Sequence, residues 1–214
     1  MLTLLKALVA ILPGVGWLHF YRRKDHARPE PVALVLKAFF LGGVLLIPAG
    51  LSEAFFGGLF GVSERSGSFA AVAVYAFFVV GLSEELAKLG ALWAVYHEPA
   101  FDEELDGLVY GAAAGAGFAT FENLFYVLKY GMGAAIARAL MAVPSHVFEG
   151  VLIGYGLTQL KFKGRRAYAA GCFALAVFAH GLYDVALFAQ PMTPYPMIFV
   201  SLMVTFGLAR LSER

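Results

Sequence analysis

Charged residues are scarce in this sequence, making up 14% of its 214 residues, whereas soluble domains usually carry about 25%. Hydrophobic residues account for 60% of the chain. Such a composition predicts a protein built for the lipid bilayer rather than for water. The formal net charge of +1 gives no basis for a nucleic-acid partner.

Cysteine is almost absent as well, because Cys172 is the only one in the sequence. A single cysteine excludes an internal disulfide framework. Cys172 lies within an apolar run, and a free cysteine in such surroundings usually behaves as a small buried hydrophobic residue. We therefore expect it to pack in the interior rather than to carry chemistry.

Long apolar segments follow one another along most of the chain. A hydrocarbon core of about 30 Å needs roughly 20 mostly apolar residues per helical crossing. The first segment lacks a small-residue cleavage site before YRRKDHARPEP, so we interpret it as a helix rather than a signal peptide. The candidates lie at about residues 3–20, 32–51, 69–96, 107–128, 134–160, 167–189 and 196–209. They predict an all-α, polytopic integral membrane helical bundle of about seven transmembrane helices. The bundle forms one domain over residues 1–214. The alternative is six helices, because the segment at 196–209 is short.

The positions of lysine and arginine predict the orientation, since cytoplasmic loops are enriched in them. If the N-terminus is extracytoplasmic, ten of these residues fall on the cytoplasmic side, and Arg65 and Lys129 fall on the other. We therefore expect a multi-pass protein of the cell membrane with an extracytoplasmic N-terminus and a cytoplasmic C-terminus.

Polar and charged residues interrupt four of the apolar segments. A charged side chain at the bilayer centre costs at least about 2.5 to 3.5 kcal/mol on insertion scales, so such residues usually face a bundle interior and mark function. These residues are Glu84, Glu85 and Lys88; Glu122 and Asn123; Arg138, His146 and Glu149; and His180 and Asp184. Counted at about 1.5 Å per residue, Glu84, His146 and His180 lie near mid-membrane, and Glu122 is shallower. We therefore predict one polar cluster among four helices, within a core of about residues 69–189.

Helical spacing predicts which of these residues share a face. Glu84 and Lys88 are four residues apart, so we expect Lys88 to neutralise Glu84 while Glu85 points elsewhere. One lysine carries one charge and cannot neutralise both adjacent carboxylates. We therefore expect Glu85 to activate water in any hydrolysis, or Glu84 if Lys88 pairs with Glu85 instead. His180 and Asp184 are also four residues apart, and can present two ligands, or an imidazole with an orienting carboxylate, to one point.

The fifth segment carries further local signals. Pro144 should bend the helix beside His146, Glu149 is placed to orient that histidine, and Arg138 should snorkel toward the membrane surface. Glycines at helical spacing predict seams where helices approach closely. These glycines are Gly111, Gly115, Gly117, Gly150 and Gly154.

A buried cluster of carboxylates and histidines can support hydrolysis. A carboxylate can serve as the general base for water, and histidines with carboxylates can hold Zn²⁺ or another divalent metal while leaving a position open for water. The sequence contains neither H-E-x-x-H nor G-x-S-x-G. A serine-protease interpretation is therefore weak.

The ordered set EELAK, DGLVYGAAAGAGFATFENLFYVL, SHVFEG and HGLYD resembles the PrsW family of membrane-embedded proteases, which is distantly similar to the CAAX prenyl proteases. The resemblance implies a membrane peptidase that acts in regulated proteolysis of single-pass membrane proteins, such as an anti-sigma factor. It also implies roles for the matching residues. These are catalytic Glu84, Glu85, His146 and His180; supporting Lys88, Asn123 and Glu149; and metal ligands Glu122, His146, His180 and Asp184.

Two other functions stay open at this point. A proton-coupled transporter or channel could use the acids and histidines as a relay through the bundle. A catalytically idle scaffold could bind helical membrane partners through its glycine seams. A transporter more often shows internal repeats or paired half-helices, and the sequence has neither.

Overall fold

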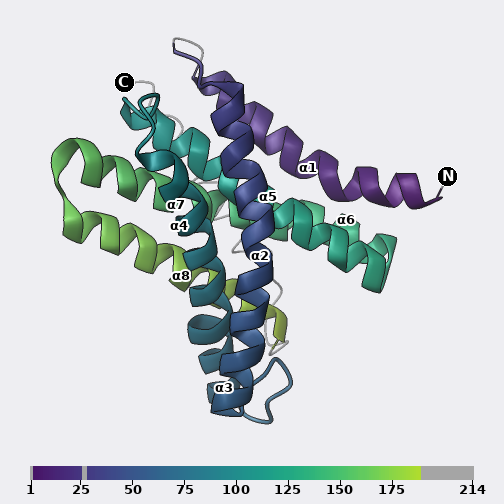
Figure 1. The fold of residues 1–214 in the computed structure, drawn as a ribbon. Helices are drawn as coiled ribbons and strands as arrows, with labels where there is room; N and C mark the ends of the chain where they lie inside the picture. The colour runs from purple at the N-terminus through teal and green to yellow at the C-terminus, as the bar shows by residue number, and fades with distance from the viewer. Residues whose placement is uncertain (1, 26–27, 189–214) are drawn as a thin grey trace.

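The computed structural model describes residues 2–25 and 28–188, and over these ranges the chain is a bundle of helices without strands (Figure 1). This confirms the all-α prediction. The elements are α1 (Leu2–Lys24), α2 (Val32–Phe60), α3 (Phe69–Val74), the π-helical η1 (Tyr75–Gly81), α4 (Leu82–Tyr96), α5 (Glu104–Tyr130), α6 (Met132–Leu140), α7 (Ala142–Lys163) and α8 (Arg166–Phe188).

Five helical segments in the described part are long and apolar enough to cross a membrane. The protein is therefore a multi-pass membrane protein. The predicted crossing at 107–128 corresponds to α5, which is 27 residues long but rich in glycine and alanine and is not one of the five. The predicted crossing at 196–209 lies outside the described residues, so the count of seven stays a prediction. The five are Leu4–Lys24, Val32–Phe60, Phe69–Tyr96, Met132–Lys163 and Arg166–Phe188.

Helix α5 lies at the centre of the bundle, packed against α7 on one face and against α2 and α1 on others (Figure 1). Three glycines of α5 face backbone carbonyls of α7 so closely that a Cβ atom at any of them would overlap the carbonyl oxygen. The predicted glycine seam is thus confirmed, and only glycine allows this approach. The pairs are Gly107 with Gly154, Gly111 with Gly150, and Gly115 with His146.

The π-helical segment η1 comes directly before the glutamate pair Glu84 and Glu85. Segments of this kind often occur at functional sites. Gly81, at its end, packs against α8, where an added Cβ would lie 3.4 Å from the backbone nitrogen of Gly181. This close approach brings the start of α4 beside the turn of α8 that carries His180.

The bend predicted for Pro144 is present. The helix breaks at Met141, between α6 and α7, and Pro144 is the third residue of α7. A proline has no N–H to donate to the carbonyl four residues earlier, and its ring clashes with that carbonyl, which here belongs to Leu140 at the end of α6. The break sets the start of α7, which carries His146.

A second polar cluster lies at the other end of α5, where the α1–α2 connection meets it. This loop acid cluster consists of Asp25, Glu30, Asp106 and Tyr110, all buried. The N–H of Glu30 donates to Asp25 at 2.9 Å, the Tyr110 hydroxyl donates to Glu30, and Asp106 accepts from the backbone N–H of Glu103 at 2.6 Å. Burial, followed by the hydrogen bond with Asp106, raises the pKa of Glu30 to about 8.

Candidate active site

A cavity of about 430 Å³ opens among α2, η1 and helices α4 to α8. Side chains from all four of the interrupted segments line it, so the predicted polar cluster forms one site. The predicted residues in its wall are Glu84, Glu122, Arg138, His146, Glu149, His180 and Asp184.

Lys88 pairs with Glu85 and not, as predicted, with Glu84. Its Nζ lies 2.6 Å from Glu85 Oε1 and 2.6 Å from Glu149 Oε2 on α7, and all three side chains are buried. Residues three and four apart are both neighbours on a helix, so spacing alone does not decide between the two glutamates. The decisive contact is Glu149, because it draws the lysine toward the side of α4 where Glu85 points.

His180 lies between the glutamate pair and Asp184. Its Nδ1 is 2.6 Å from Glu85 Oε1, while its Nε2 is 3.4 Å from Asp184 and 3.6 Å from Glu84 Oε2. The predicted contact of His180 with Asp184, one turn further on, is therefore present. An imidazole held at both nitrogens by carboxylates has a fixed orientation.

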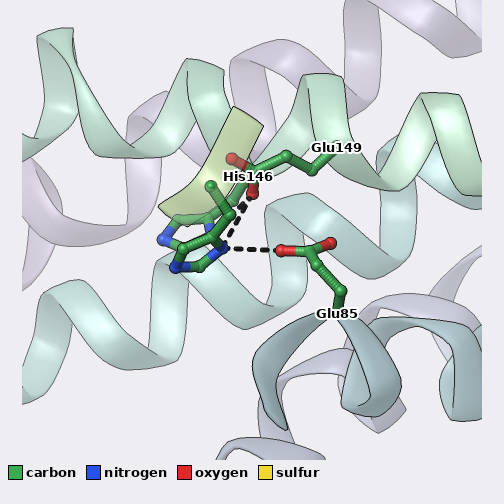
Figure 2. A group of neighbouring side chains, drawn as sticks. Glu85, His146 and Glu149 are labelled. Carbon is green, nitrogen blue, oxygen red and sulfur yellow. Dashed lines mark hydrogen bonds and ion pairs between the residues drawn. The ribbon is translucent and has the colours of Figure 1, made fainter. Parts of the chain in front are cut away.

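His146 comes from α7 and approaches the same point from the other side. Its Nε2 lies 3.0 Å from Glu122 and its Nδ1 lies 3.4 Å from Glu149. Figure 2 shows that Glu85, His146 and Glu149 point toward one another from their helices. The two histidine rings are adjacent, with centroids 5.3 Å apart.

Arg138 does not snorkel as predicted. Its guanidinium forms an ion pair with Glu122, lies 3.9 Å from the centroid of the Tyr126 ring and is 12% exposed. Because α6 folds back against α5, the arginine reaches a carboxylate inside the protein before it reaches the surface. Arg138 thus pairs with Glu122, as Lys88 pairs with Glu85 and Glu149.

Glu84 is left without such a cation. Its Oε2 is buried with no hydrogen-bond partner, and it lies 3.6 Å from His180 Nε2 and 3.9 Å from His146 Nδ1. Glu84 lines the cavity, whereas Glu85 lies behind its wall. The adjacent glutamates therefore differ: Glu85 belongs to a buried ion-pair network, and Glu84 faces the space where a substrate would lie.

The donor atoms also suit a divalent metal. Ligand atoms of Glu85, His146, Glu149 and His180 lie within 4.8 Å of one another, as do those of Glu84, Glu122 and His146. Imidazole and carboxylate are ordinary zinc ligands, and buried atoms such as His146 Nδ1 and Glu85 Oε2 have no hydrogen-bond partner. The residues therefore fit a metal. Asp184 belongs to neither group and contacts His180 instead.

Asn123 is buried but does not line the cavity. Its Nδ2 donates to the backbone carbonyl of Ala10 at 3.4 Å, so it links α5 to α1. Two residues that sequence reasoning missed do reach the site. Ser145 donates to Glu149 at 2.9 Å, a contact that its spacing of four residues could have suggested, and Glu53 of α2 lines the cavity.

The chain resembles known proteins over most of its length. Residues 30–209 match the model of a family described as PrsW family intramembrane metalloprotease. The chain belongs to the PrsW family. It is 38% identical over 200 residues to Protease PrsW of Geobacillus kaustophilus, covering 92% of this chain and 85% of that protein. It is 35% identical over 210 residues to Protease PrsW of Bacillus subtilis, covering 94% and 91%.

Protease PrsW of Clostridioides difficile is 33% identical over 199 residues, covering 87% of this chain and 79% of that protein. No solved structure matches. Membership of the PrsW family makes this protein a membrane-embedded peptidase, which acts on membrane-associated substrates in a lipid bilayer. The transporter and scaffold alternatives lose their support, because the family is one of proteases.

Proposed function

We propose that this intramembrane protease cleaves its substrate in the cavity described above, with Glu84 activating water. The observation that carries the proposal is the position of Glu84 in the cavity wall, where its Oε2 lies 3.6 Å from His180 Nε2 and 3.9 Å from His146 Nδ1 and has no described lysine or arginine partner. Glu85 and Glu149 share Lys88, and Glu122 has Arg138. Asp184 also lines the cavity without such a cation, but its ion-pair contact among the described residues is with His180 alone.

Glu84 can act first as base and then as acid. It accepts a proton from water as the water oxygen bonds to the scissile carbonyl carbon, and it returns that proton to the amide nitrogen as the C–N bond breaks. The products are a carboxylic acid and an amine. Donors facing the cavity stabilise the oxyanion that forms between the two steps, and the histidines His146 and His180 are nearest to Glu84.

His146, His180, Glu85 and Glu149 would hold the metal that the family description implies. When bound, such a metal polarises the carbonyl and makes water a better nucleophile at neutral pH. In this arrangement Glu122 and Asp184 orient the two histidines, since they contact the ring nitrogens that face away from Glu85 and Glu149.

Metal analysis of the purified protein in detergent tests this part of the proposal. Stoichiometric zinc or another divalent metal in the wild type, and its loss in His180→Ala, is the expected result. If the wild-type protein contains no metal and still cleaves a co-expressed membrane substrate, the metal part of the proposal is wrong. The role of Glu84 is then tested by Glu84→Gln alone.

We propose that the substrate is a single-pass membrane protein, such as an anti-sigma factor, which is cut in regulated proteolysis.

We also propose an orientation: the protease would lie in the cell membrane with its N-terminus extracytoplasmic and its C-terminus cytoplasmic. Reporter fusions after Arg28 and Arg166 should then report the cytoplasm, and fusions after Arg65 and Gly131 the outside. Finding Arg65 and Arg166 on the same side would contradict this orientation.

A further inference from the structure

A second cavity lies outside the catalytic site. It is an apolar groove of about 690 Å³ between α4, α7 and α8, which shares no lining residue with the catalytic cavity. Its walls include Leu89 and Trp93 of α4, Leu157 and Leu160 of α7, and Phe173 of α8. We call it the α4–α8 groove.

The groove faces the lipid. Its walls belong to segments that can each cross a membrane, and two of its side chains, Leu86 and Trp93, are 50% and 48% exposed. Apolar surface on such helices is covered by hydrocarbon in a bilayer. Trp93 stacks on Tyr96, and this aromatic pair is typical of the level where hydrocarbon meets the headgroups.

Arg166 stands at this polar end, and it is the one charged side chain lining the groove in the described part of the chain. Three basic neighbours already have partners: Lys163 pairs with Glu104 at 2.7 Å, Arg165 donates to Gln159 at 3.3 Å, and Lys161 donates to the Tyr96 carbonyl at 2.6 Å. No described side chain forms an ion pair or hydrogen bond with the Arg166 guanidinium. Helix α8 also begins at Arg166 and has no acidic residue in its first turn, so its N-terminal end favours an anion.

We propose that the α4–α8 groove binds an anionic phospholipid, with an acyl chain along the apolar walls and the phosphate at Arg166. Arginine suits a phosphate because its planar guanidinium offers two parallel donors. Arg165, whose bond to Gln159 leaves its charge uncompensated, adds a second positive charge at the same turn. An acidic headgroup is therefore preferred to a zwitterionic one.

The test uses the purified full-length protein in a neutral detergent, with phosphatidylglycerol or phosphatidylcholine of the same acyl chains. We expect native mass spectrometry to retain more phosphatidylglycerol than phosphatidylcholine, and phosphatidylglycerol to raise the melting temperature more. Arg166→Gln should weaken phosphatidylglycerol binding several-fold. Lys163→Gln is the matched control: it removes the same charge three residues away, outside the groove, and should bind as the wild type does.

Filling the groove provides an independent variant. Ala170 is exposed and lines the groove, so Ala170→Trp should reduce phosphatidylglycerol binding while leaving every charge in place. Equal binding of the two lipids, or equal losses in Arg166→Gln and Lys163→Gln, would overturn the proposal. So would a full effect from inorganic phosphate alone, which would indicate a simple anion site, or wild-type binding by Ala170→Trp.

Discussion

Helix α5 carries a polar cluster at each end, and the two clusters neutralise their acids in different ways. Asp106 and Glu122 are 16 residues apart on this helix, about 24 Å at about 1.5 Å per residue. At the Glu122 end, buried carboxylates pair with Lys88 and Arg138. At the Asp106 end, no described lysine or arginine forms an ion pair with the loop acid cluster, where the partners are a tyrosine hydroxyl, backbone N–H groups and other carboxyls.

The comparison separates the proposed catalytic cluster from a structural one. Buried cations favour the ionised form of neighbouring acids, and ionised acids can bind a metal. In the loop acid cluster, burial and neighbouring carboxyls favour the protonated form of Glu30 instead, with its pKa raised to about 8. Substitutions in the ion-pair network and in the loop acid cluster should therefore have different consequences.

The largest effect on stability is expected from Lys88→Ala. The substitution leaves Glu85 and Glu149 buried without their shared cation. Removing one partner of a buried ion pair typically costs about 3 to 5 kcal/mol. We expect little folded protein, measured as yield and melting temperature in detergent.

Lys37→Ala is the control for that experiment, because Lys37 forms an ion pair with Glu98 at 2.7 Å at a partly exposed site. Exposed pairs contribute about 0 to 1 kcal/mol. If Lys37→Ala and Lys88→Ala lower the yield and the melting temperature equally, the buried ion pairs of Lys88 do not stabilise the protein more than an exposed pair does.

The glycine seam runs between the two ends of α5. Replacing a glycine by alanine at one end or the other should show which end the catalytic site depends on. Gly115→Ala and Gly107→Ala both push α5 away from α7, and overpacking typically costs about 1 to 3 kcal/mol. Gly115 faces the carbonyl of His146, whereas Gly107 faces that of Gly154. At matched stability, cleavage should fall further in Gly115→Ala. An added Cβ atom at Gly171 would have nothing within 4 Å, so Gly171→Ala should change neither the stability nor the cleavage.

A smaller, pH-dependent effect is expected at the loop acid cluster. The pKa of Glu30 is about 8 in the folded protein against 4.5 ordinarily, so the folded state binds the proton more tightly. Its contribution to stability is fully present below pH about 4.5 and is lost as pH rises through about 8. The melting temperature should therefore fall between about pH 4.5 and 8, and Glu30→Gln should flatten that fall. An equally steep fall in Glu30→Gln would assign it to other groups.

Much of this architecture could be predicted from the sequence, because apolar length and intramembrane polar residues are strong signals. The described helices follow six of the predicted segments, and the glycine seam and the contact of His180 with Asp184 are present. Short-range spacing was enough for these features.

The predictions that were wrong concern long-range partners. Lys88 could reach Glu84 or Glu85 by helical spacing, and Glu149, 61 residues away, decides between them. Arg138 finds Glu122 only because the chain breaks at Met141 and α6 turns back toward α5. No local pattern predicts the position of Glu149 beside Lys88 or the packing of α6 against α5.

The most direct test of this account compares Glu84→Gln with Glu85→Gln, measuring cleavage of a co-expressed membrane substrate and the melting temperature in parallel. Glu84→Gln should keep the wild-type melting temperature and lose about 10² to 10⁴-fold in cleavage, the usual contribution of a positioned general base. Glu85→Gln should lower the melting temperature, because it weakens the contact with Lys88. A Glu85→Gln variant that is stable but inactive, beside a Glu84→Gln variant that cleaves normally, would contradict the assignment of Glu84 as the base.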